Sequence, residues 1–194
     1  MKVAFIGTHG VGKTTLCYDL AAGLKKRDLS VELVREVARE CPLPINRDTT
    51  VKAQAWILHT QIAWELVAEA KADVVCCDRA VLDNFCYLKR AAAGNPHVEV
   101  LERLVKAWTP TYDLLFRVPV LGDPRFDGIR DTDLAFQHDI DALIVATLRD
   151  WGIPYIALDP ASRPRWAEVV VETLLPRLKP QALLFPENGS AADS

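Results

Sequence analysis

The chain has 194 residues, of which half are hydrophobic and a quarter are charged, and its formal net charge is −3. This length allows one good hydrophobic core but not two ordinary domains. The weakly acidic balance, without any basic stripe, argues against a nucleic-acid-binding or membrane-surface protein. No signal peptide is recognisable and no apolar run approaches the roughly 20 residues that cross a bilayer, so we expect a cytoplasmic protein.

Apolar runs of strand length alternate along the chain with longer segments of helical period. This is the pattern of an α/β protein with a parallel sheet. The runs are nearly continuous, as expected for strands that are buried on both faces. The five predicted strands span residues 2–6, 30–34, 73–77, 113–118 and 154–158.

Helices are predicted between and after these strands. The first is indicated by the apolar stripe of Leu16, Leu20 and Leu24, and a long second helix follows with Asp48 or Thr49 as its N-cap. The second, third and fourth helices span about 49–71, 132–151 and 165–178. We therefore predict one domain over residues 1–180, followed by a small, polar and flexible tail over residues 181–194.

The five cysteines are odd in number and show no C-x-x-C spacing. Cys76 and Cys77 lie inside an apolar run, where we expect them to act as small buried residues. The pattern favours a reduced protein and disfavours a structural zinc site.

Residues 7–15, Gly-Thr-His-Gly-Val-Gly-Lys-Thr-Thr, match the phosphate-loop motif G-x-x-x-x-G-K-[ST] in full. The motif lies between a buried strand and an amphipathic helix, where backbone N–H groups and the helix N-terminus attract phosphate. Lys13 is expected to reach the β- and γ-phosphates of ATP, and the Thr14 hydroxyl is expected to bind Mg²⁺. His9 is expected to face solvent or a phosphate rather than act as a base. The residues predicted to contact the nucleotide are Thr8, His9, Gly10, Val11, Gly12, Lys13, Thr14 and Thr15.

A second acid follows the third predicted strand. Four apolar residues lead into Asp78 and Arg79, which is typical of a strand whose acid organises Mg²⁺ through water. The carboxyl ends of strands in an open α/β sheet face the ligand crevice. The alternative is a surface Asp–Arg pair of little energetic consequence.

Charged residues also follow the second predicted strand. Glu36 there could accept a proton from a substrate hydroxyl, and Arg35 and Arg39 could hold an anionic acceptor. A solvated charged loop explains the same residues equally well.

Amide side chains on the long second helix could read the acceptor. Gln54, Gln61 and Glu65 are seven and four residues apart and share a face. An amide can hold a nucleobase or carboxamide edge, although a plain exposed face is the preferred interpretation. Asn84 and Tyr87, just beyond the Asp-Arg pair, are similarly placed.

With these residues, the sequence resembles the P-loop nucleoside and nucleotide kinase superfamily. The closest resemblance is to the AAA-type ATPase/kinase domain family that includes ribosylnicotinamide kinase domains. It covers about residues 1–160, although Ala80 stands where many such kinases have Ser or Tyr. The resemblance depends on residues 7–15, 35–40, 78–79 and 127–133.

The resemblance implies a three-layer P-loop NTPase fold with a five-stranded parallel sheet in the order 2-3-1-4-5. It gives Glu36 the role of a catalytic or metal-organising acid after the second strand. Asp78 and Arg79 take the place of the Asp-Arg or Glu-Arg pair that such kinases carry after the third strand. It further implies a lid over about residues 119–133 that contributes Arg125 and Arg130 to the transferring phosphoryl group.

The function implied is Mg²⁺-dependent transfer of the ATP γ-phosphoryl to a small nucleoside- or nucleotide-like acceptor. The alternative is a regulatory ATPase or nucleotide-dependent switch that acts on a protein partner. A nucleotide-binding module without turnover is a weaker third hypothesis, because Lys13, Thr14 and Asp78 are all present.

Overall fold

The computed structural model describes residues 1–45, 48–92, 94–121 and 134–178. Its strands form one five-stranded sheet in the order β2-β3-β1-β4-β5, and every neighbouring pair is parallel. The strands are β1 Lys2–Ile6, β2 Val31–Val34, β3 Val74–Asp78, β4 Leu114–Arg117 and β5 Ile156–Ala157. This confirms the predicted fold class and strand order, that of a P-loop NTPase.

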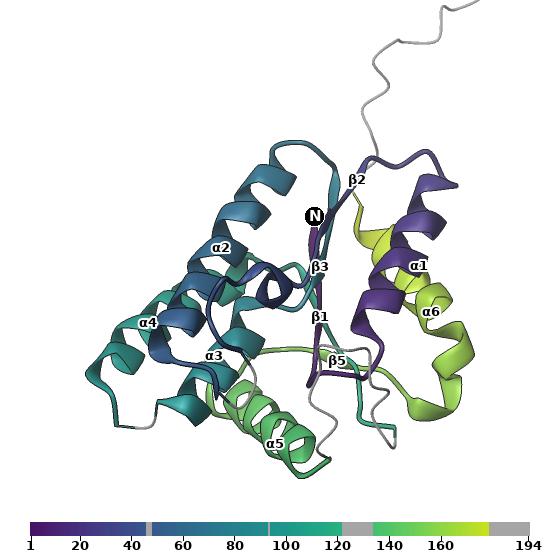
Figure 1. The fold of residues 1–194 in the computed structure, drawn as a ribbon. Coiled ribbons are helices and arrows are strands. Elements are labelled where there is room, and N and C mark those ends of the chain that lie inside the picture. Colours follow the sequence, from purple (N-terminus) through teal and green to yellow (C-terminus); the bar gives the residue numbers. More distant parts are fainter. Residues whose placement is uncertain (46–47, 93, 122–133, 179–194) are drawn as a thin grey trace, which may run out of the picture.

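Helices cover both faces of the sheet and make a three-layer molecule (Figure 1). One face carries α1 Lys13–Lys25 and α6 Trp166–Leu174, and α2 Val51–Glu69, α3 Val81–Ala91, α4 Pro96–Trp108 and α5 Leu134–Asp150 lie on the other side. Short 3₁₀ turns are η1 Val37–Glu40, η3 Thr109–Thr111, η4 Pro160–Arg165 and η5 Leu175–Arg177.

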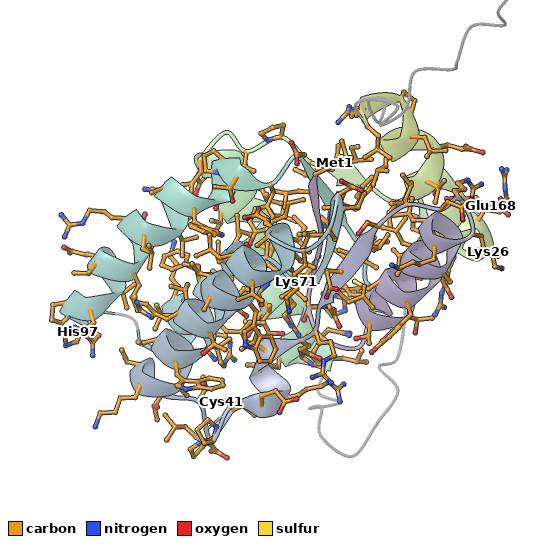
Figure 2. All side chains as sticks on the ribbon, turned by 90° about the horizontal axis from the view of Figure 1, so that it is seen from above. Met1, Lys26, Cys41, Lys71, His97 and Glu168 are labelled. Atoms are coloured by element: carbon orange, nitrogen blue, oxygen red, sulfur yellow. The ribbon has the colours of Figure 1, made fainter. Side chains whose placement is uncertain are left out.

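Side chains fill the two spaces between the sheet and its helices (Figure 2). Successive residues of a strand point to opposite faces, so Val3 and Phe5 of β1 join the core under α1 and α6, and Ala4 and Ile6 join the other core. The predicted stripe of Leu16, Leu20 and Leu24 and both adjacent cysteines, Cys76 and Cys77, are buried as expected.

The structure corrects several predicted boundaries. β3 includes Asp78 as its last residue, and β5 is shorter than predicted because it pairs only with the end of β4. The N-cap of α2 is Thr50, not Asp48 or Thr49, because the Thr50 hydroxyl accepts the Ala53 N–H at 3.2 Å.

Two helices, α3 and α4, were missing from the prediction. Residues 81–88 of α3 are all buried, and Val81, Phe85 and Leu88 recur at helical spacing, so the sequence carries a signal for this helix as well. The start of α4 carries a recognisable signal, Asn95 as N-cap and Pro96 in the first turn.

Some predictions lie outside the part of the chain that the structure describes. They are the tail over 181–194, most of the predicted lid over 119–133, and with it Arg125 and Arg130. Within the described ranges, no helix combines the length and apolar content that a membrane crossing requires.

Candidate functional site

The phosphate loop connects β1 to α1 at the carboxyl end of the central strand. Gly7, with φ of 148°, leaves β1, and Gly12, with φ of 98°, precedes the first residue of α1. Both values favour glycine. A Cβ atom at Gly7 would also lie 2.7 Å from the Val118 carbonyl oxygen. The tight curl therefore leads the chain directly into a helix N-terminus, the geometry that binds phosphate.

Lys13 is the first residue of α1 and its side chain turns back over the loop. Its Nζ donates to the carbonyl oxygens of Gly7 at 2.9 Å and Thr8 at 2.5 Å. Burial, together with the nearby positive charge of Arg79, lowers the pKa of Lys13 to about 8. An arriving phosphate would stabilise the charged form of this amine.

Thr14 and Asp78 meet beside the loop. The Thr14 hydroxyl donates to Asp78 Oδ2 at 2.5 Å, and the Asp78 side chain is buried. A hydroxyl and a carboxylate are hard oxygen ligands, and Mg²⁺ bound with a nucleotide commonly uses only one or two protein ligands. The pair fits Mg²⁺ for that reason, although the described residues contain no group of three or more His, Cys, Asp or Glu side chains able to hold a metal ion.

Asp78 and Arg79 do not pair with each other, so the interpretation of a surface Asp–Arg pair is wrong. Arg79 is buried, and its Nε and Nη2 donate to Glu36 Oε1 at 2.9 and 2.8 Å. Arg39 donates from Nε to the other oxygen, Glu36 Oε2, at 2.9 Å. Two guanidinium groups thus hold one carboxylate from opposite sides.

The charged segment after β2 is therefore only partly solvated. Glu36 is 8% exposed, whereas Arg35 and Glu40 are more than half exposed and form a loose ion pair at 3.9 Å. The interpretation of a solvated loop is wrong for Glu36, because Arg79 lies 43 residues away in the sequence and supplies the buried partner.

Arg79 has a strained backbone, with φ of 97°. Such a conformation costs a non-glycine residue on the order of 1–3 kcal/mol and clusters at functional sites. The Arg79 carbonyl accepts from Gln61 Nε2 at 3.3 Å, and Gln61 also donates to Glu65 Oε1 at 2.9 Å. This buried side chain pair, on α2, supports the turn that directs the Arg79 side chain at Glu36.

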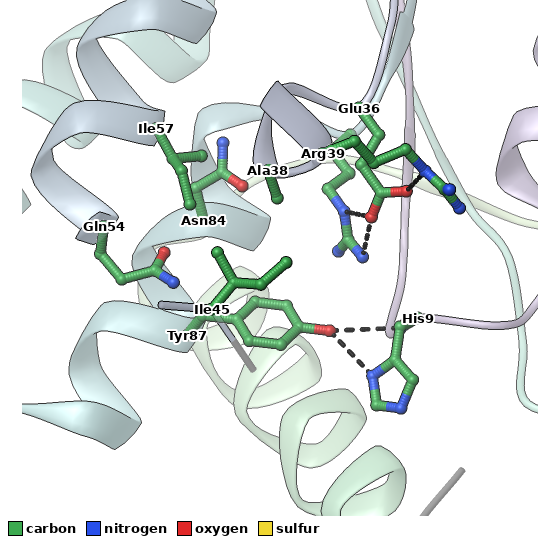
Figure 3. A pocket seen from close by; sticks show the side chains of 10 residues that line it. His9, Glu36, Ala38, Arg39, Ile45, Gln54, Ile57, Asn84 and Tyr87 are labelled. Carbon is green, nitrogen blue, oxygen red and sulfur yellow. Dashed lines mark hydrogen bonds and ion pairs between the residues drawn. The ribbon is translucent and has the colours of Figure 1, made fainter. Parts of the chain in front are cut away.

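A narrow pocket lies between the phosphate loop, η1, α2 and α3 (Figure 3). We call it the Glu36 pocket. Its cavity volume is about 30 Å³. Its polar lining is His9, Glu36, Arg39, Gln54, Arg79, Asn84 and Tyr87, and its apolar lining is Ala38, Ile45 and Ile57.

His9 is buried, so the expectation that it faces solvent is wrong. Its backbone N–H and its ring Nδ1 both contact the Tyr87 hydroxyl, at 3.2 and 3.1 Å (Figure 3). Gln137 of α5 donates to the His9 carbonyl at 2.7 Å, and the Phe136 ring lies 5.5 Å from the His9 ring. The side chains of α3 and α5 thereby fix the middle of the phosphate loop.

The residues predicted to bind the acceptor fall in three places. Arg39 and Gln54 line the Glu36 pocket, with Gln54 only 4% exposed. Arg35 lines a neighbouring pocket beside Thr14. Gln61 is buried against Glu65 and lines neither pocket. The preferred interpretation of an exposed amide face is wrong, because α3 packs over this side of α2.

Sequence reasoning missed Asp83, which connects the site to α3. Its Oδ1 accepts the Gly7 N–H and its Oδ2 accepts the Ala80 N–H, both at 2.9 Å. Burial raises the pKa of Asp83, while the charges of Arg79 and Lys13 oppose that shift. An acidic side chain three residues after the N-cap is a known signal for the start of a helix. A prediction of α3 with Ala80 as N-cap would therefore have pointed to Asp83.

One comparison with known proteins agrees with this geometry. A family described as AAA domain matches residues 2–165, from β1 through η4. The chain belongs to this AAA domain family. A search of the curated proteins found no match.

The matched range of this AAA domain contains the phosphate loop, the Thr14–Asp78 pair and the Glu36 pocket. Family membership makes the protein a P-loop nucleotide-binding protein. It leaves open whether the phosphoryl group goes to water or to an acceptor molecule.

Proposed function

We propose that this AAA domain is a Mg²⁺-dependent kinase that transfers the γ-phosphoryl of ATP to a small nucleoside- or nucleotide-like acceptor in the Glu36 pocket. The observation that carries the proposal is the buried carboxylate of Glu36, which lines a pocket of mixed polar and apolar character beside the phosphate loop. Hydrolysis needs room only for water at the γ-phosphate. An apolar wall and buried amides are the lining chemistry of a site for a larger molecule, for which the pocket would have to open.

The phosphate loop would hold the donor. Its N–H groups and the α1 N-terminus would bind the phosphates, and the Lys13 amine would leave the Gly7 and Thr8 carbonyls for phosphate oxygens. Thr14 and Asp78 are the residues that would hold Mg²⁺, directly and through water. Mg²⁺ supplies neutralisation of the charge that develops on the phosphate oxygens.

Glu36 would orient the acceptor and take its hydroxyl proton. Arg79 and Arg39 fix both carboxylate oxygens, so the position of the carboxylate is set before the acceptor binds. Phosphoryl transfer passes through a loose transition state in which positioning contributes more than base strength. A carboxylate held in this way fits that requirement.

The predicted lid completes the proposal. Arg125 and Arg130, which lie outside the described ranges, would close over the transferring group and neutralise its equatorial oxygens. The end of the single domain near residue 180, with a flexible tail after it, also stays a prediction.

The test is to incubate the protein with labelled ATP, Mg²⁺ and a panel of nucleosides, nucleotides and vitamins. We expect ADP formation that depends on one acceptor, together with the phosphorylated product. Lys13→Ala serves as the control and should abolish nucleotide binding or turnover. Acceptor-independent hydrolysis would instead indicate the regulatory ATPase, and tight binding without turnover would indicate a binding module.

A further inference from the structure

The turn between β3 and α3 is held by buried side chains on both of its sides. Arg79 occupies this turn with φ of 97°, and a strained residue persists only where its surroundings over-determine its conformation. The Arg79 carbonyl accepts from Gln61 Nε2 at 3.3 Å, and the Ala80 N–H donates to Asp83 Oδ2 at 2.9 Å. These two contacts leave the next backbone donor, at the start of α3, to a third side chain.

Tyr112, between η3 and β4, is that third side chain. Its hydroxyl accepts the N–H of Val81, the first residue of α3, at 3.0 Å and donates to Glu65 Oε1 at 2.6 Å. The phenol is 8% exposed, and burial and the charge of Glu65 raise its pKa well above the ordinary value. The hydroxyl therefore keeps its proton for Glu65 and offers a lone pair to Val81.

The contacts on the two sides of the turn meet at one atom. Glu65 Oε1 also accepts from Gln61 Nε2, at 2.9 Å. Gln61 binds the carbonyl of Arg79, and Tyr112 binds the N–H two residues later, at Val81. The short segment that contains the strained residue is thus fixed at both ends relative to a single carboxylate oxygen.

The side-chain position of Arg79 depends on this backbone conformation. Its guanidinium donates to Glu36 Oε1 through Nε and Nη2, and its Nη1 reaches the Gly7 carbonyl at 3.5 Å. Its Cζ lies 5.2 Å from the centre of the Tyr87 ring. A change of φ toward the ordinary negative range would redirect the side chain and release one side of the Glu36 carboxylate.

We propose that Tyr112 is a positioning residue for phosphoryl transfer, whose hydroxyl fixes the start of α3 and thereby keeps Arg79 in the strained conformation that holds Glu36. This inference rests on the proposed function and deepens it. Tyr112 does not line the Glu36 pocket, so it acts through Arg79 and not on the acceptor. A hydroxyl is required because it donates and accepts at once, whereas a phenylalanine would leave the Val81 N–H unpaired.

The test is Tyr112→Phe, which removes one oxygen atom and keeps the ring. With an acceptor that supports ADP formation, kcat should fall about tenfold or more, because a small displacement of a positioned group is costly in rate. The KM for ATP should stay within about threefold, since the phosphate loop is unchanged. The thermal midpoint should fall by about 2–10 °C for the lost hydrogen bonds, so rates are measured well below it.

The matched control for this loss of stability is Val105→Ala. Val105 is fully buried in the same core as Tyr112, and its side chain has no polar group with which to bind the turn. Truncation should lower the thermal midpoint by a similar amount or more and leave kcat at the wild-type value. An equal fall of kcat in both variants, or a normal kcat in Tyr112→Phe, would overturn the positioning role.

A second measurement needs no turnover. The Nε–H resonance of Arg79, assigned by its loss in Arg79→Lys, reports the contact with Glu36 in the nucleotide-free protein. Its hydrogen exchange with water should become about tenfold faster or more in Tyr112→Phe and stay unchanged in Val105→Ala.

The two measurements separate this inference from the proposed function. A fall of kcat with unchanged exchange at Arg79 would overturn the action of Tyr112 through Arg79 and leave the kinase standing. Faster exchange in Tyr112→Phe, in a protein that forms no ADP with any acceptor, would support the hold of Tyr112 on Arg79 and refute the kinase. Unchanged exchange and an unchanged rate would overturn the inference outright.

Discussion

Asp83 accepts the Gly7 N–H at 2.9 Å with one carboxylate oxygen and the Ala80 N–H at 2.9 Å with the other. The first residue of the phosphate loop is therefore tied to the first turn of α3, 76 residues further along the chain. Because α3 also carries Asn84 and Tyr87, one carboxylate sets the position of the loop relative to the Glu36 pocket.

Asp83→Asn should weaken both stability and nucleotide binding. The amide keeps one acceptor oxygen and turns an NH₂ group toward a backbone N–H, so one buried hydrogen bond is lost. We expect the free energy of unfolding to fall by about 1–3 kcal/mol in urea titrations. The exposed Asp139→Asn is the control and should stay within about 0.5 kcal/mol of the wild type. Equal stabilities for both variants would contradict the anchoring role.

Lys13 should make nucleotide binding depend on pH. Its pKa is about 8 in the nucleotide-free protein, and the phosphates would hold it protonated in the complex. Below pH 8 the amine already carries its proton, and above pH 8 binding must take one up. Affinity should then fall by up to about tenfold per pH unit. Calorimetry in two buffers of different ionisation enthalpy should detect proton uptake at pH 9 and almost none at pH 6.5.

Lys13→Arg is the matched comparison for this pH dependence, because guanidinium keeps its charge throughout the range. Any binding that the variant retains should show no proton uptake at pH 9. Uptake of the same size in both proteins would assign the titration to another group.

Glu36→Gln should lower kcat and leave the KM for ATP nearly unchanged. The amide preserves the shape of the side chain but cannot take a proton, and a general base typically contributes 10²–10⁴-fold. Glu40→Gln is a control from the same turn, since Glu40 is exposed and only loosely paired with Arg35. A normal rate with acceptor would remove Glu36 as the base.

Glu65→Gln should destabilise the fold rather than the chemistry. Glu65 is fully buried and accepts from Lys2, Trp108 and Tyr112 at 3.0, 2.7 and 2.6 Å. Removing one charge of a buried pair costs about 3–5 kcal/mol. We expect the lower end of that range in thermal or urea unfolding, because Glu69 still pairs with Lys2 at 2.9 Å.

Glu69→Gln is the corresponding control, since Glu69 is 38% exposed. Its loss should cost less than about 1 kcal/mol. If the two variants unfolded at the same urea concentration, the buried network around Glu65 would not be the stabilising feature.

The phosphate loop and the parallel sheet could be predicted because their signals are local. Residues 7–15 are contiguous, and two glycines, a lysine and a hydroxyl at fixed spacing permit one backbone curl. The strands are short apolar runs because both of their faces are covered. The sequence also carries a helical apolar spacing for α3, in Val81, Phe85 and Leu88. What it does not show is that the polar Asp83 and Asn84 of that helix are buried, because their burial depends on tertiary packing.

The sequence by itself determined that this protein folds around a parallel sheet and binds a nucleotide through its first loop, since both depend on neighbouring residues. Only the tertiary structure decided that Glu36, Gln54 and Arg79 are buried in one pocket. The sequence leaves Glu36 open between a site acid and a solvated loop, keeps a surface pair as the alternative for Arg79, and favours an exposed face for Gln54. The segments after β2 and β3 and the start of α2 instead bring all three to one buried pocket. The physical reason is that the burial of a polar side chain depends on partners distant in the sequence, which no local spacing encodes.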